Sequence, residues 1–174
     1  MVNAEVRKVD ALIFDKDGTL FDYHATWSVA SADLIETLSA GDADRRKRLA
    51  EVMDFDLNLG QFRPTSMTND SERGARSNLS HAGVLDHFEM IVGFDSGFGA
   101  KPYPDPLLAI AAQMDIAPER CAMVGDSTHD LIAGRAAGMQ SVAVLTGVAE
   151  ANELRPHADV VLRDIGEIPA WLRQ

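Results

Sequence analysis

The sequence predicts an α/β protein built on a doubly wound parallel sheet. Short apolar runs that suit buried strands alternate with stretches of helical periodicity through the second half of the chain. This alternation is typical of a parallel sheet with helices on both faces. The first apolar run ends at two carboxylates, at the position where open α/β sheets place ligands. With 174 residues the chain is short for two domains, so we expect one core over residues 1–174.

The first half of the chain is expected to hold one strand and three helices. The apolar run that ends before Asp15 predicts the strand, and helices are predicted over 24–39, about 43–56 and 71–82. Residues 57–67 specify no strand because their apolar residues are scattered between turn formers. The apolar residues that recur at helical spacing in the first helix are Trp27, Ala30, Leu34 and Leu38.

The second half of the chain alternates regularly. Residues 88–94 (FEMIVGF) predict a strand, and a turn-rich loop then leads into a helix over about 105–114. The elements expected after that are strands over 121–124, 141–145 and 160–162, a helix over 128–137 that Gly138 ends, and a terminal helical turn around Trp171.

Asp15 and Asp17 form the most informative pair in the sequence. Residues i and i+2 of an extended segment point the same way, so both carboxylates can face one site. Two like charges held this close are costly unless a cation or a proton lies between them. The pair therefore predicts a metal ion, a phosphorylated ligand, or both.

Further polar residues follow the other predicted strands. Asp126 comes directly after the strand CAMV and a glycine, so its carboxylate is expected at the same sheet edge as Asp15. Carboxylates and a backbone carbonyl are ligands that suit Mg²⁺. Lys101 supplies a cation for phosphate oxygens. The remaining candidates for this site are Asp17, Thr68, Asn69 and Asp130.

Composition excludes several classes of function. The formal net charge of −11 would repel a polyanion, so we expect no nucleic-acid partner. No apolar run approaches the roughly 18 residues that a membrane span needs, so no membrane association is expected. Cys121 is the only cysteine, which rules out an intrachain disulfide and suits a reducing cytoplasm.

Four motifs in order resemble those of the haloacid dehalogenase (HAD) superfamily, in its phosphatase branch close to phosphoglycolate phosphatases. They are DKDGTLFD at 15–22, TNDSERGARSNLSHAGV from Thr68, Lys101–Pro102, and GDSTHD at 125–130. The resemblance implies a Rossmann-like core, a phosphatase acting on a small phosphorylated metabolite, and Mg²⁺ as cofactor.

The resemblance also implies a role for each motif residue. Asp15 would be the nucleophile that forms an aspartyl-phosphate, and Asp17 would protonate the leaving oxygen and later activate water. Thr68, Asn69 and Lys101 would bind the transferring phosphoryl group. The implied metal ligands are Asp15, the Asp17 carbonyl and Asp126, with Asp130 in a supporting position.

The stretch between the first two motifs is shorter than the helical cap domain that this branch normally carries. Residues 23–66 can form about two helices, so we expect a residual cap or a shortened insert. The cap is either naturally reduced or lacks an internal segment. An open site would then accept a large phosphoester, or a second subunit of a homo-oligomer would supply a lid.

Three other functions compete with the phosphatase hypothesis. A phosphomutase on the same scaffold needs a cap that retains the phosphorylated intermediate, and the short insert argues against it. A receiver-like signalling domain also uses acidic residues, a Thr and a Lys, but it needs no proton donor at the position of Asp17. The third alternative is a catalytically weak interaction module that keeps the fold.

Overall fold

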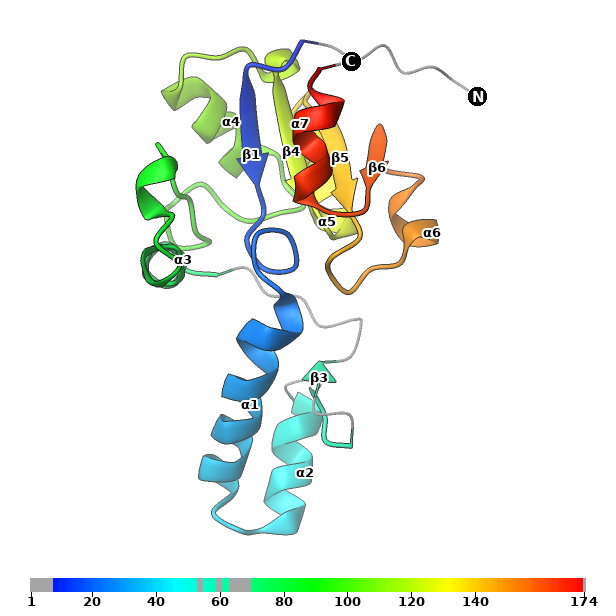
Figure 1. The fold of residues 1–174 in the computed structure, drawn as a ribbon. Coiled ribbons are helices and arrows are strands. Elements are labelled where there is room, and N and C mark those ends of the chain that lie inside the picture. The colour runs from blue at the N-terminus through cyan, green and yellow to red at the C-terminus, as the bar shows by residue number, and fades with distance from the viewer. Residues whose placement is uncertain (1–7, 53–54, 59–60, 63–69, 174) are drawn as a thin grey trace.

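A four-stranded parallel sheet lies at the centre of the structure. The computed structural model describes residues 8–52, 55–58, 61–62 and 70–173 (Figure 1). The strand order is β1-β4-β5-β6, with every neighbouring pair parallel. The prediction of an α/β fold with a parallel sheet is confirmed. The strands are β1 (Ala11–Phe14), β4 (Cys121–Gly125), β5 (Gln140–Val144) and β6 (Val160–Leu162).

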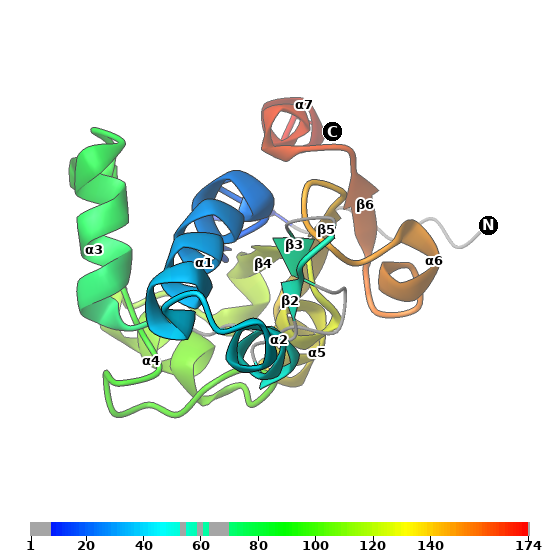
Figure 2. The same ribbon diagram turned by 90° about the horizontal axis from the view of Figure 1, so that it is seen from below.

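Helices cover both faces of the sheet (Figure 2). Helices α4 (Asp105–Gln113) and α5 (Thr128–Ala136) pack on one face, and α7 (Ile168–Trp171) packs on the other. Strand β4 shows the alternation that this arrangement requires, because Met123 faces the α4–α5 layer and Val124 faces α7. All five residues of β4 are buried, as expected for a central strand of a parallel sheet.

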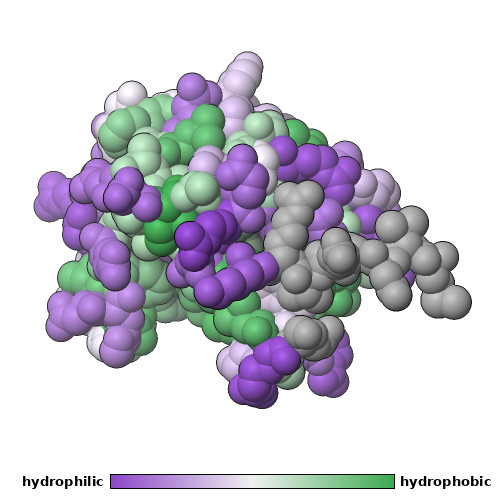
Figure 3. Space-filling model, turned by 90° about the horizontal axis from the view of Figure 1, so that it is seen from above, coloured by the Kyte–Doolittle hydropathy of each residue, from purple (hydrophilic) through white to green (hydrophobic). Residues whose placement is uncertain are grey.

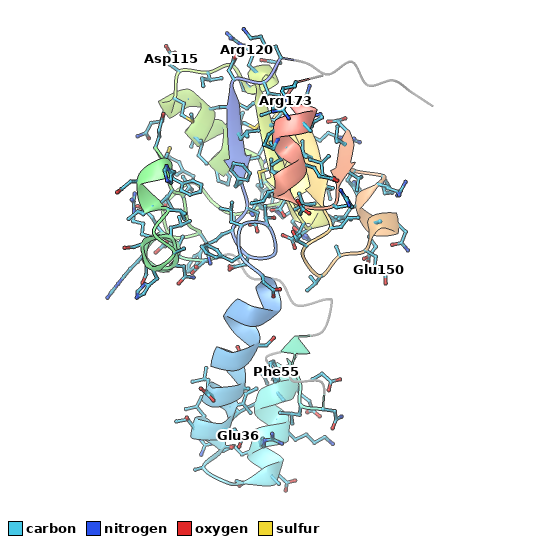
Figure 4. All side chains as sticks on the ribbon, in the orientation of Figure 1. Glu36, Phe55, Asp115, Arg120, Glu150 and Arg173 are labelled. Atoms are coloured by element: carbon cyan, nitrogen blue, oxygen red, sulfur yellow. The ribbon has the colours of Figure 1, made fainter. Side chains whose placement is uncertain are left out.

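Beyond the carboxyl ends of the strands, α1 (Tyr23–Ser39) and α2 (Ala43–Val52) form an antiparallel hairpin (Figure 1). The two-residue strands β2 (Phe55–Asp56) and β3 (Gln61–Phe62) pair with each other beside it. A small core of its own holds the hairpin together, and Figure 4 shows Phe55 within it. The buried members of this core are Ile35, Ala50 and Phe55, and Val148 from the loop after β5 packs against them.

Two expectations for this hairpin are wrong in detail. Helix α2 ends at Val52 rather than near residue 56, because Phe55 pairs with Phe62 in the short ladder and is buried. In α1, Leu34 and Leu38 are 47% and 43% exposed, whereas Ile35 is 1% exposed. Among the described side chains of α1, Ile35 is therefore the large apolar residue that is buried, and the two leucines are largely exposed.

The strand predicted over 88–94 is also wrong. These residues form no regular element. They face β1 across an open cavity of about 360 Å³ that α3 (Glu72–His81) and α4 also line. Within the described residues, the only strand that pairs with β1 is β4, so the described chain offers segment 88–94 no ladder at the outer edge of β1. An apolar run forms a strand only where a neighbouring strand supplies hydrogen-bond partners, and the cavity separates the two here.

The other predicted elements agree with the structure to within two residues. Helix α3 begins after Ser71, whose side chain accepts a hydrogen bond from the Gly74 N–H at 3.0 Å. The elements that the sequence did not predict are the short strands β2 and β3, α6 (Ala151–Leu154), and single 3₁₀ turns at Leu85–His87, Pro118–Arg120 and Ile165–Glu167. Among the described residues, no helix is both long and apolar enough to cross a membrane.

Candidate active site

Three predicted site residues meet at the carboxyl ends of β1 and β4. Asp15 follows β1, Asp126 follows β4, and Asp130 lies in the first turn of α5. Each offers a carboxylate oxygen, and these three oxygens all lie within 4.8 Å of one another. Within the described part of the chain, this is the one group of three such side chains that could hold a metal ion.

The opposite end of the sheet has a different character. Arg120 lies there (Figure 4) and forms an ion pair with Asp10 next to β1. Figure 3 views the molecule from this end, and hydrophilic and hydrophobic side chains alternate across the surface. The group of three carboxylates lies at the carboxyl ends of the strands, as expected for an open α/β sheet.

Asp126 is fixed by the turn that follows β1. Thr19 donates its hydroxyl hydrogen to Asp126 Oδ1 at 2.9 Å, and both side chains are buried. Gly18 has φ of +90° and lies so close to the Asp126 carboxylate that a Cβ atom would collide with it. Thr146 donates to the Gly18 carbonyl oxygen at 2.6 Å. The Gly–Thr pair after the two carboxylates thus positions the third, a role that the sequence reasoning missed.

Asp130 has two functions, one structural and one electrostatic. Its Oδ2 accepts hydrogen bonds from the Ser127 hydroxyl at 2.6 Å and from the Ser127 N–H at 3.1 Å, which forms a capping box at the start of α5. Its Oδ1 accepts from Lys101 Nζ at 2.5 Å. The helix cap therefore orients the carboxylate that faces the site.

Lys101 bridges two of the three carboxylates. Its Nζ donates to Asp15 Oδ1 at 2.5 Å as well as to Asp130. Burial alone would lower the pKa of Lys101, but the carboxylates of Asp130 and Asp15 outweigh it and raise the pKa above its ordinary value. Lys101 is therefore a permanent cation beside Asp15, as the sequence predicted.

The acidic cluster has more negative charge than Lys101 can balance. Burial and, to a smaller extent, the charges of Asp130 and Asp17 raise the pKa of Asp15 to about 6. Burial and the charges of Asp15 and Asp130 raise the pKa of Asp126 to about 7. Carboxyl groups with raised pKa values gain from a bound cation, because it removes the repulsion between them. Three hard oxygen donors this close fit Mg²⁺.

The Asp17 side chain is not one of the three carboxylates of this cluster. Its carboxylate is buried, and Oδ1 accepts a hydrogen bond from Lys16 Nζ at 2.7 Å. Lys16 Nζ also lies 3.1 Å from Asp70 Oδ2. The sequence reasoning assigned no role to Lys16 or Asp70. The signal was a lysine placed between two aspartates in DKD, which puts a cation within reach of either carboxylate.

Two predicted phosphate-binding residues, Thr68 and Asn69, lie outside the described residues. The described chain resumes at Asp70, whose contact with Lys16 brings the start of this motif beside the first. The geometry therefore unites Asp15, Asp126, Asp130 and Lys101 in one cluster, and Lys16 joins Asp17 to Asp70 beside it.

The sequence and the fold are both similar to known proteins. A family model described as haloacid dehalogenase-like hydrolase matches residues 61–144. A phosphoglycolate phosphatase of Chromobacterium violaceum is 42% identical over 102 residues, which are 59% of this chain and 45% of that protein. Pyrophosphatase PpaX of Oceanobacillus iheyensis is 31% identical over 121 residues, 69% of this chain and 54% of that protein.

The chain thus spans about half the length of the curated relatives it matches. Among solved structures, a conserved haloacid dehalogenase-like protein of unknown function from Agrobacterium tumefaciens has a TM-score of 0.66 at 22% identity, over 95% of this chain and 98% of that one. The family match contains Lys101 and Asp126, and the fold places Asp15 beside them. In sequence and in fold the chain is thus similar to haloacid dehalogenase-like hydrolases.

Proposed function

We propose that the protein is a Mg²⁺-dependent phosphomonoesterase that acts through an aspartyl-phosphate on Asp15. The observation that carries the proposal is the convergence of Asp15, Asp126, Asp130 and Lys101 at one end of the sheet. Phosphoryl transfer needs charge neutralisation and positioning more than covalent assistance. A nucleophilic carboxylate next to a fixed ammonium group meets both needs.

Each residue has a distinct part in the proposed reaction. Asp15 attacks the phosphorus atom, and the alcohol oxygen leaves with a proton from Asp17. Asp17 then takes a proton from the water that hydrolyses the aspartyl-phosphate and restores the Asp15 carboxylate. Lys101 neutralises charge on the phosphoryl oxygens during both steps. Thr68 and Asn69 remain proposed phosphate ligands.

Mg²⁺ is the proposed cofactor. Asp15, Asp126 and the backbone carbonyl of Asp17 would hold the ion, and Asp130 would support it from the end of α5. Asp17 can serve as a ligand through its backbone carbonyl, which leaves its side-chain carboxyl, beside Lys16, available for proton transfer. When bound, the ion offsets negative charge on the phosphoryl group and on the cluster.

A small phosphorylated metabolite is the proposed substrate. The names of the relatives include a phosphoglycolate phosphatase and a pyrophosphatase, and both act on small phosphate compounds by name. The α1–α2 hairpin extends beyond the carboxyl ends of the strands, on the side of the sheet where the site lies (Figure 1). A second subunit remains a proposed source of a lid over the site.

The direct test is hydrolysis of an aryl phosphate in the presence of Mg²⁺. We expect Asp15→Asn to lower kcat by ~10⁴-fold or more, the order of loss seen when a nucleophile is removed. Asp33→Asn, which changes an exposed carboxylate on α1, is the matched control and should keep full activity. Equal activity of the Asp15→Asn variant and the control would refute the proposal.

A further inference from the structure

Lys16 lies between an acidic residue of the first motif, Asp17, and one of the second, Asp70. Its Nζ is 2.7 Å from Asp17 Oδ1 and 3.1 Å from Asp70 Oδ2. The side chains of Lys16, Asp17 and Asp70 are only 11%, 6% and 16% exposed. Ion pairs that are this well shielded from water are screened weakly, so the contacts constrain geometry more than surface pairs do.

Asp70, the partner of Lys16 in the second motif, is itself held in place by its neighbours. Asp70 Oδ1 accepts a hydrogen bond from the Ser71 N–H at 2.7 Å, directly before α3. Gly74 leaves the space that the Asp70 carboxylate fills, since a Cβ atom there would collide with it. Lys16 Nζ also lies 5.7 Å from the centre of the Phe21 ring, within the range of a cation–π contact. Helix α3 therefore supplies a firm anchor for the lysine.

Asp17 depends on such an anchor more than Asp15 does. Asp15 Oδ1 is held by Lys101, and its backbone N–H bonds to Val124 in β4 at 2.8 Å. Asp17 precedes Gly18, which has a φ of +90°, so the backbone turns sharply right after it. Without a partner, the Asp17 carboxyl could rotate about its side-chain dihedrals to other staggered positions.

We propose that Lys16 is a positioning residue that aims the Asp17 carboxyl at the leaving oxygen, using Asp70 as its anchor. This inference rests on the proposed phosphatase activity. A proton donor contributes only when its carboxyl lies within hydrogen-bond reach of the departing oxygen. Lys16 thus acts on the reaction through Asp17 and need not touch the substrate.

The test compares leaving groups of different basicity. A proton donor matters most for an alkyl phosphate such as glycerol 2-phosphate, whose leaving alkoxide is strongly basic, and least for p-nitrophenyl phosphate. We expect Lys16→Met to lower kcat on the alkyl ester by ~10²-fold and on the aryl ester by less than ~10-fold, with KM little changed on both. Lys16→Arg should restore part of the alkyl activity.

Lys47→Met is the matched control, since Lys47 is an exposed lysine on α2. It should leave both activities unchanged. Equal losses on the two esters after Lys16→Met would overturn the positioning role, because a structural defect would not distinguish the leaving groups.

A double-mutant cycle measured by thermal denaturation tests the Lys16–Asp70 contact without an activity assay. If Lys16 bridges to Asp70, the fall in Tm of the Lys16→Met/Asp70→Asn double variant should be smaller than the sum of the two single falls. Additive falls would overturn the link. If the unmodified protein hydrolyses neither ester, the proposed function fails, while the cycle still decides whether Lys16 and Asp70 are coupled.

Discussion

The two edges of β1 differ sharply. The inner edge pairs with β4 over four residues in parallel register, from Ala11 opposite Cys121 to Phe14 opposite Val124. The outer edge faces the open cavity of about 360 Å³, with the irregular segment 88–94 on its far side. Within the described residues, one edge of β1 is thus paired in the sheet, and the other faces a cavity.

The site draws residues from both sides, and they are held in different ways. Asp126 and Asp130 come from the paired side, where ladder hydrogen bonds and the α5 cap fix them. Lys101 and Asp70 both line the cavity on the outer side. Their positions depend on ion pairs with Asp15, Asp130 and Lys16. The comparison indicates that electrostatic contacts, more than backbone pairing, complete the site on its outer side.

Among the tests of this comparison, the loss of Lys101 has the largest expected effect. Lys101→Met should lower kcat/KM for phosphate-ester hydrolysis by ~10³-fold, since it removes the cation that neutralises the phosphoryl oxygens. The substitution also leaves Asp15 and Asp130 without the ammonium group between them. Steady-state kinetics at saturating Mg²⁺ would measure the loss. A loss of less than ~10-fold would mean that the outer side contributes little to catalysis.

A second prediction concerns stability on the two sides. Leu131 is fully buried beneath β5, whereas Ile91 is half-buried at the cavity. Leu131→Ala should lower the free energy of unfolding by ~3 kcal/mol, because it opens a void in a close-packed region. Ile91→Ala should cost less than ~1.5 kcal/mol, since its surroundings are already open. Urea denaturation of both variants would measure this, and equal costs would contradict the comparison.

The smallest predicted effect is a pH-dependent response to Mg²⁺. The pKa values of about 6 for Asp15 and about 7 for Asp126 lie above those of unfolded chains, so the folded state binds these protons more tightly. The two groups therefore stabilise the metal-free fold at low pH, and this contribution falls as the pH rises from about 4 to about 7. Mg²⁺ should replace the protons at high pH.

We accordingly expect Mg²⁺ to raise Tm by a few degrees at pH 8 and by little at pH 5, as measured by thermal denaturation. In the Asp126→Asn variant, the rise in Tm that Mg²⁺ causes should be nearly the same at pH 8 as at pH 5, because the substitution removes one charge from the cluster. A Mg²⁺ shift of the same size at both pH values would contradict the assignment of the site.

The paired side was predictable from sequence for a physical reason. The runs CAMV and SVAVL are wholly apolar and bounded by turn residues, and both are buried strands in the structure. The carboxylates that follow β1 and β4 are carried to one edge by parallel pairing alone. The position of Asp130 at the start of α5 was equally predictable, because Ser127 three residues earlier completes a capping box with it.

The structure on the outer side of β1, and several contacts elsewhere, could not be predicted from the sequence in the same way. FEMIVGF has the composition of a strand, but strand formation depends on a partner that the local sequence does not describe. In the α1–α2 hairpin, Leu34 and Leu38 fit a helical repeat but are largely exposed, whereas Ile35 is buried. The contact of Lys16 with Asp70 joins residues 54 positions apart, and no spacing rule covers such a pair.

Trapping of the phosphorylated enzyme would test the central claim most directly. The protein would be mixed with Mg²⁺ and an aryl phosphate, quenched in acid within the first turnovers, digested, and analysed by mass spectrometry. The account predicts a phosphoryl adduct on Asp15 that is absent from the Asp15→Asn variant. Steady hydrolysis without an adduct, or an adduct on another residue, would contradict it.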